Sequence, residues 1–157
     1  NEFLSLAKDK GKLKLNTKKL IEMKFVDTFS KQAPKQAVAI CIRYKMRYMK
    51  GVKIKKDNFF KLEVLNTPYN QIKNLYKTPK EQEEDDDIDP RAELVLKRIM
   101  FHELTHCLLE KGHLPNEDKY KNQIMSSQFN RYDDLLENWD EMVEDNFTKD
   151  LNYMDPL

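Results

Sequence analysis

The three histidines of the chain, His102, His106 and His113, all lie within one twelve-residue window. His102 and His106 are four residues apart, so their side chains project from the same face if the segment is helical. Residues 91–111 contain no glycine or proline and predict such a helix, and Gly112 predicts its end because glycine adopts the left-handed conformation without steric cost. We therefore expect a helix that carries two histidines toward one point and a turn that returns the third.

The window reads H-E-x-x-H at residues 102–106, a pattern whose two histidines can fill two corners of a tetrahedral zinc site. A catalytic zinc has three protein ligands and one open position, and His113 is the candidate for the third ligand. Glu103 lies about 100° around the helix from His102, so its carboxylate is expected beside the metal, where it can act as a general base. These residues predict one Zn²⁺ per chain, held by His102, His106 and His113.

The chain resembles the metzincin clan of zinc peptidases (zincins), whose members read H-E-x-x-H-x-x-G-x-x-H and later turn through a methionine beneath the zinc. Residues 124–126, Ile-Met-Ser, look like that turn. The chain is also similar to small bacterial metallopeptidases with a cysteine directly after the second histidine. The resemblance implies a zincin-like α+β fold with a small mixed sheet, an edge strand, an active-site helix, a Met-turn at Met125 and a C-terminal helix. It also implies a zinc-dependent endopeptidase that hydrolyses peptide bonds through a water activated by Glu103.

Two departures from the metzincin pattern concern the third ligand. Six residues separate His106 from His113 where the clan has five, and Gly112 adjoins the third histidine instead of preceding it by three residues. We therefore expect a turn built differently. Leu114 follows the third histidine where several metzincin families have a diagnostic polar residue, so assignment to the astacins, matrixins or adamalysins fails. Tyr120 and Tyr132 are the candidates for a side chain that stabilises the transition state.

We expect a single domain over residues 1–157, because a chain of this length with 39% hydrophobic residues can form one buried core but not two ordinary ones. Apolar spacing predicts helices over residues 17–32, 91–111 and 132–147, and strands over residues 37–48 and 52–55, the shorter strand at the sheet edge. Residues 1–16 are expected to form an N-terminal extension, and residues 66–90 a loop with an acidic insertion at 83–87.

Cys41 and Cys107 are the only cysteines. We expect them to lie close together, because the strand that holds Cys41 should pack on the helix face opposite the histidines. They are either two buried thiols or a disulfide, and a disulfide would require an oxidising compartment. The chain begins at Asn1 and not at a methionine, which is consistent with removal of a leader or lipid anchor, so an extracytoplasmic location is favoured over a cytoplasmic one.

Charge is unevenly distributed, with 17 Lys or Arg and 6 Asp or Glu in residues 1–65 and a net charge of about −10 in the rest. The basic residues are scattered through expected helices and strands, so we interpret them as solvated surface and expect no nucleic-acid partner. No apolar run approaches the roughly 18 residues of a membrane span. The expected partner is a peptide or protein substrate, and the chain is expected to be a monomer.

Two alternatives remain open. In the first, a gluzincin-like peptidase, the third zinc ligand is an acid on the last helix, Glu137 or Glu141, and His113 is incidental. In the second, the chain is a non-catalytic binding module that zinc stabilises, because metal binding contributes folding energy when the site forms only in the folded state.

Overall fold

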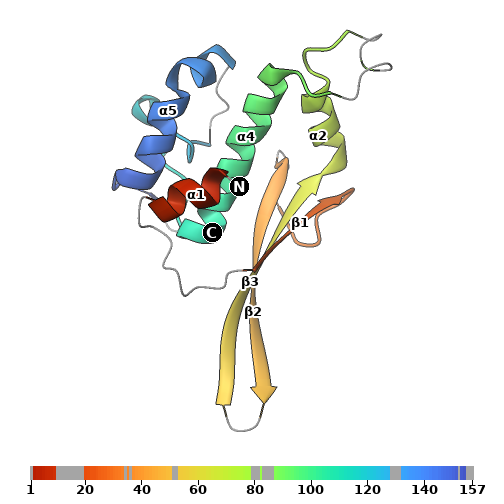
Figure 1. Cartoon of the computed structure of the whole chain (residues 1–157), viewed down its shortest axis with the longest axis vertical. Helices are drawn as coiled ribbons and strands as arrows, with labels where there is room; N and C mark the ends of the chain where they lie inside the picture. The colour runs from red at the N-terminus through yellow and green to blue at the C-terminus, as the bar shows by residue number, and fades with distance from the viewer. Residues whose placement is uncertain are drawn as a thin grey trace.

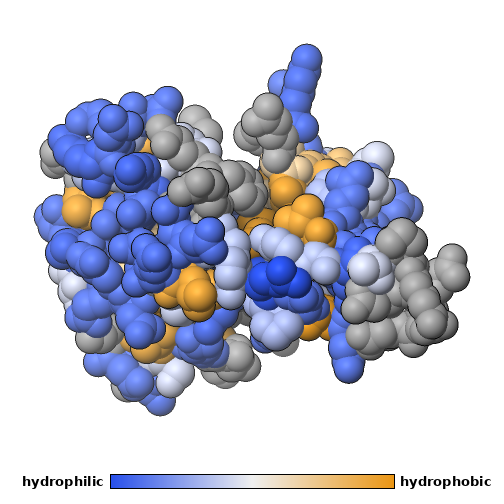
Figure 2. All heavy atoms as spheres, turned by 90° about the horizontal axis from the view of Figure 1, so that it is seen from above, coloured by the Kyte–Doolittle hydropathy of each residue, from blue (hydrophilic) through white to orange (hydrophobic). Residues whose placement is uncertain are grey.

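The computed structural model describes residues 2–9, 20–33, 35, 37–50, 53–78, 82, 87–127, 132–151 and 153–154. These residues form an α+β fold in which a three-stranded mixed sheet meets a group of helices (Figure 1). The predicted α+β class and small mixed sheet are therefore confirmed. Hydrophilic residues cover most of the face seen in Figure 2, and hydrophobic residues appear there as separate patches.

The sheet has the order β1-β3-β2, with β1 (Leu20–Val26) parallel and β2 (Ala39–Lys50) antiparallel to the central strand β3 (Lys53–Leu65). β1 pairs only with Phe59–Leu65, so β2 and the first half of β3 continue as a two-stranded ribbon that projects from the rest of the fold (Figure 1). The prediction of a short edge strand over residues 52–55 is wrong. Residue 52 lies outside the described residues, Lys53–Lys55 begin the long central strand, and the edge strands are β1 and β2.

The prediction of a helix over residues 17–32 is also wrong, because residues 20–26 form the strand β1. Residues 17–19 lie outside the described part of the chain. Short apolar runs can fit helical and strand spacing equally well, and pairing with a neighbouring strand then determines which structure forms. Here residues 20–26 pair with the last seven residues of β3. The ring of Phe25 also packs 4.8 Å from that of Tyr69 on α2 (Asn66–Lys73).

Two helices occupy segments expected to be irregular. α1 (Glu2–Asp9) lies within the predicted N-terminal extension, and its Phe3 and Ala7 are buried in the core. α2 (Asn66–Lys73) begins the predicted loop of residues 66–90, with Pro68 in its first turn, where a proline is tolerated. Residues 10–16 and most of the acidic insertion at 83–87 lie outside the described residues.

The core joins α1, α4 (Pro90–Leu104) and α5 (Tyr132–Thr148) to one another and to the sheet. The centre of the Phe3 ring lies 5.2 Å from the ring centre of Phe101 on α4 and 5.1 Å from that of Phe147 on α5. Trp139 packs edge-on against Phe101, with ring centres 5.2 Å apart. α5 confirms the predicted last helix. Within the described part of the chain, no helix is long and apolar enough to cross a membrane.

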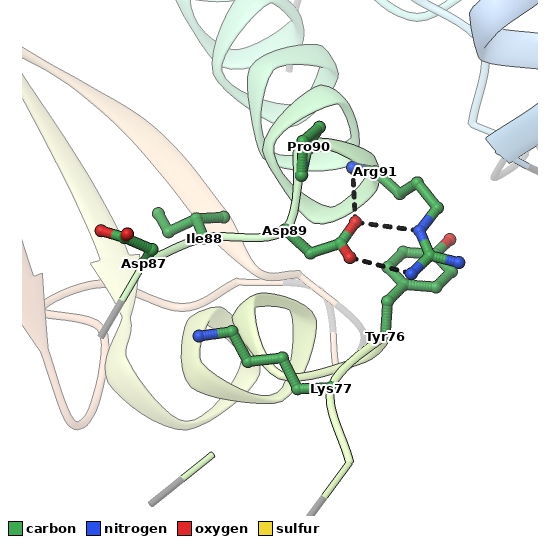
Figure 3. Close-up of a pocket in the computed structure, with 7 residues that line it drawn as sticks. All are labelled: Tyr76, Lys77, Asp87, Ile88, Asp89, Pro90 and Arg91. Atoms are coloured by element: carbon green, nitrogen blue, oxygen red, sulfur yellow. Dashed lines mark hydrogen bonds and ion pairs between the residues drawn. The ribbon is translucent and has the colours of Figure 1, made fainter. Parts of the chain in front are cut away.

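α4 begins at a well-defined N-cap (Figure 3). The Asp89 carboxylate accepts hydrogen bonds from the Arg91 backbone N–H at 2.8 Å and from the Arg91 guanidinium at 2.8 and 2.9 Å. The guanidinium also lies 4.4 Å from the centre of the Tyr76 ring. These contacts, with Pro90 in the first turn, determine where the helix that carries the histidines starts.

Replacing Asp89 with alanine should lower the melting temperature by a few degrees near neutral pH, because α4 loses its N-cap. Hydrogen bonds from Arg91 hold the pKa of Asp89 at about 2, below its ordinary value of 3.8. The stabilisation is therefore present above about pH 4 and is lost as the pH falls through 2. Thermal melts of the parent and variant should converge as the pH is lowered, whereas Asp89→Asn, which can still cap, should remain close to the parent near neutral pH.

Candidate metal centre

The three histidines meet at one point although they come from three local structures. His102 is in the last turn of α4, His106 is in the π-helical turn η1 (Thr105–Leu109), and His113 is in the irregular segment that follows. The Nε2 atoms of His102 and His113 are 3.0 Å apart, and each lies 3.2 Å from Nε2 of His106. Among the described residues, this is the group of metal-ligating side chains that can share one ion.

Two backbone carbonyls orient two of the rings. Nδ1 of His102 lies 2.7 Å from the Ile124 carbonyl oxygen, and Nδ1 of His106 lies 2.7 Å from the Lys111 carbonyl oxygen. A carbonyl only accepts hydrogen bonds, so each Nδ1 carries the proton and donates it. Each Nε2 is then left with a lone pair, which is the arrangement of metal-bound histidines whose other nitrogen is held by the protein.

The donor set fits a divalent metal ion such as Zn²⁺. Burial, with smaller effects from Arg98 and His106, lowers the pKa of His102 to about 3, and burial also lowers the pKa values of His106 and His113. The rings are therefore neutral near pH 7, the form that binds metal. Nitrogens on a tetrahedral zinc lie about 3.3 Å from one another, close to the distances between the three Nε2 atoms. A cation would relieve the repulsion between their converging lone pairs.

The chain reverses direction two residues earlier than predicted. η1 ends at Glu110, which has a left-handed backbone with φ 57°, so the predicted helix end at Gly112 is wrong. The Glu110 carboxylate pairs with Arg43 on β2 at 3.2 Å, which helps to hold this conformation in a residue other than glycine. Gly112 directly precedes His113 and is buried, so a side chain at this position would need space that glycine does not.

The segment expected to form the Met-turn contacts α4 and the loop of the third histidine through three successive carbonyls. Ile124 accepts from His102, Met125 accepts from the backbone N–H of Leu114 at 3.0 Å, and Ser126 accepts from the Arg98 guanidinium at 2.8 Å. All three acceptor residues are buried. Because Leu114 directly follows His113, one short segment holds both α4 and the loop of the third histidine.

The Glu103 side chain connects α4 to the edge strand β2. Its Oε2 accepts a hydrogen bond from the Cys41 backbone N–H at 3.1 Å. Burial raises the pKa of Glu103 to about 8, opposed by the bond from Cys41 and by the positive charge of Arg98. A dication held by the neighbouring histidines would favour the ionised carboxylate, since an opposite charge lowers the pKa of an acid.

A disulfide joins the edge strand to the metal centre. Cys41 on β2 and Cys107 in η1 are bonded, with their Cα atoms 5.8 Å apart. The predicted proximity of the two cysteines is thus confirmed, and of the two alternatives the structure contains the disulfide. Cys107 is the residue after His106, so the bond fixes β2 against the turn that carries the second histidine.

The other candidates are two exposed acids, a buried tyrosine and a tyrosine near the start of α4. Glu137 and Glu141 are exposed on α5 and do not belong to the metal-ligating group, so the structure does not support an acidic third ligand from the last helix. Tyr120 is buried in the core. Tyr132 packs against Tyr76, which contacts Arg91 at the opposite end of α4, and the eleven residues from Arg91 to His102 span about 16 Å of helix.

The sequence analysis did not identify two residues that contact the histidines or change their pKa values, Arg98 and Lys111. Arg98 is buried one turn before His102 and lowers the pKa values of His102 and His113. Lys111 supplies the carbonyl that orients His106. Arg98 could have been found, because it lies four residues before His102 and therefore on the same helix face.

Comparisons with family models, curated proteins and solved structures found no match to this chain. The functional assignment therefore rests on the chemistry of the site itself.

The purified protein should bind about one Zn²⁺ per chain, and its melting temperature should fall when a chelator removes the metal. A site formed only in the folded state adds its binding free energy to folding. Elemental analysis and thermal melts before and after dialysis test this, with the chelator already saturated by zinc as the control. Unchanged melting after verified metal removal would contradict it.

Replacing both Cys41 and Cys107 with serine should lower the free energy of unfolding by about 2–4 kcal/mol, because the bond closes a long loop in the unfolded chain. Chemical denaturation of the parent and the double variant measures the difference. Under reducing conditions the two proteins should become similar in stability. Two alkylatable thiols in the parent protein without reductant would show that the disulfide does not form in solution.

Proposed function

We propose that this chain is a metzincin-like zinc-dependent peptidase in which His102, His106 and His113 hold the metal and Glu103 is the general base. The observation that carries the proposal is the convergence of three neutral imidazole nitrogens within 3.2 Å of one another, beside a glutamate that is not part of the metal-ligating group. Structural zinc sites usually have four protein ligands and no adjacent base.

Each protein group has a separate role in this proposal. Bound zinc would lower the pKa of a coordinated water to about 7 and polarise the scissile carbonyl. Glu103 takes the proton from the attacking water and passes it to the leaving amine. The bond from the Cys41 N–H holds the carboxylate at one oxygen, and leaves the other oxygen to move the proton. The Ile124 and Lys111 carbonyls keep the ligand nitrogens directed at the metal.

The proposed substrate is an extended segment of a peptide or protein. β2 is an edge strand, and its Cys41 N–H points at Glu103, so the outer edge of β2 faces the active-site helix. A peptide that adds to this edge by backbone pairing would lie beside the general base. The segment expected to form the sheet edge does not offer such an edge, because Lys53–Lys55 belong to the central strand β3.

The disulfide supports an extracytoplasmic location as part of the proposal. Disulfides persist in oxidising compartments and are rare where thiols are kept reduced. The bond between Cys41 and Cys107 is buried at the Cys107 end and holds the proposed substrate strand in place.

A non-catalytic zinc module is the second candidate, and one observation favours it. Glu103 already accepts a hydrogen bond from β2, and burial raises its pKa, as would be found for a carboxyl whose role is to join helix and sheet. Substitution of Glu103 distinguishes the two functions.

Glu103→Gln should retain the fold and zinc but lower peptide hydrolysis by about two to four orders of magnitude. The glutamine oxygen can still accept from Cys41, so the change removes the base and preserves the contact. Cleavage of a quenched fluorescent peptide library by zinc-loaded protein measures the rate, and Glu141→Gln, on the exposed face of α5, is the matched control. Cleavage at the parent rate would rule out Glu103 as the base, and no cleavage by the parent would favour the non-catalytic module.

His113→Ala should lose both zinc affinity and hydrolysis, because it removes a ligand and not a proton acceptor. Zinc titration and the same peptide assay separate this result from that of Glu103→Gln. Tight zinc binding together with cleavage by His113→Ala would reassign the third ligand.

A further inference from the structure

The chain beyond α5 returns to the segment that carries the third histidine. The backbone N–H of Met154 donates to the carbonyl oxygen of His113 at 2.8 Å. Leu151 and Tyr153 are partly buried and pack against the hydrophobic core. We call Leu151, Tyr153 and Met154 the C-terminal brace. It contacts the backbone of a metal ligand directly, although it is about forty residues away along the chain.

Lys111 joins the same brace to the second histidine. Its Nζ donates to the Tyr153 hydroxyl at 2.9 Å and lies 4.5 Å from the centre of the Tyr153 ring. Its backbone carbonyl accepts from Nδ1 of His106 at 2.7 Å. A shift of Lys111 would therefore move the acceptor that orients the His106 ring.

The end of α5 supports Lys111 from another side. Lys111 Nζ also donates to the Asn146 carbonyl oxygen at 2.6 Å. The Asn146 amide in turn donates to the Thr105 hydroxyl at 2.8 Å, at the first residue of η1. Burial and nearby acids raise the pKa of Tyr153 to about 12, so its hydroxyl stays neutral and receives the lysine hydrogen bond through a lone pair. Neither Lys111 nor Tyr153 belongs to the group that can ligate the ion.

We propose that the C-terminal brace and Lys111 orient His106 and His113 for the metal, so that Lys111 and Tyr153 are positioning residues of the metal centre. The inference rests on the proposed function for the presence of the ion, but not for peptide hydrolysis. Outer partners that orient ligating histidines typically change metal affinity by about 10–100-fold when they are removed.

Zinc affinity of folded variants tests the proposal. Lys111→Met removes the ammonium group and Tyr153→Phe removes only the hydroxyl. Lys149→Met is the matched control, because the contact of the Lys149 ammonium within the described part of the chain is the ion pair with Asp145 on α5. Competition of each protein with a chromophoric chelator for Zn²⁺ should show at least about tenfold weaker binding for Lys111→Met and a smaller loss for Tyr153→Phe. Lys149→Met should bind like the parent.

A pair of shortened chains tests the backbone contact. A chain ending at Met154 keeps the donor to His113, whereas a chain ending at Asn152 lacks it together with Tyr153. Only the shorter chain should lose zinc affinity. Circular dichroism of the metal-free proteins checks that each variant is folded.

The visible spectrum of bound Co²⁺ separates positioning from general destabilisation. Lys111→Met and the chain ending at Asn152 should show altered absorption bands, because ligand geometry changes; a purely structural role would lower the melting temperature and leave the spectrum of the folded protein unchanged. Parent-like zinc affinity and cobalt spectra in both would overturn the inference while leaving the proposed function intact. Tight zinc binding by the parent without peptide cleavage would overturn only the proposed function, and no metal binding by the parent would overturn both.

Discussion

The convergence of three imidazole lone pairs is the constraint on which much of this fold depends. Nitrogens held about 3 Å apart with their lone pairs facing one another repel unless a cation lies between them, and each ring must be prevented from rotating away. The protein meets the second requirement at two of the rings, those of His102 and His106, with backbone carbonyls that accept hydrogen bonds from them. The helix, the segment at Met125 and the turn after His106 can thus be understood as supports for one point in space.

The sheet is connected to the histidine segment through its edge strand β2. Cys41 makes two different connections to the histidine segment, a covalent bond to Cys107 in η1 and a hydrogen bond from its N–H to Glu103 on α4. Together with the ion pair between Arg43 and Glu110, these connections fix β2 to the segment that bears the histidines and Glu103. The position of Glu103 relative to the edge of β2 is thus set at Cys41, by its hydrogen bond to Glu103 and its disulfide to Cys107.

Local regularity explains what could be predicted from the sequence. The spacing of His102 and His106 acts within one helical turn, and the apolar pattern of residues 132–147 repeats over several turns, so neither depends on distant residues. β1 was mistaken for a helix because its partner, β3, determines its conformation. α1 was missed because Phe3 is stabilised by the distant rings of Phe101 and Phe147. The three histidines that can hold a metal could be identified by residue type. The carbonyls that orient them could not, because every residue has one and only the folded chain determines which are in reach.

The π-helical turn that contains the second histidine gives the chain tolerance in the spacing of the histidines. A turn closed by i→i+5 hydrogen bonds takes up one residue more than an α-helical turn, while the chain leaves it from nearly the same place. The extra residue between His106 and His113, relative to the metzincin pattern, can be absorbed there without displacing either ring. Ligand spacing along a sequence is thus a flexible criterion for recognising such a centre, and searches that require one fixed number of intervening residues would pass over chains built in this way.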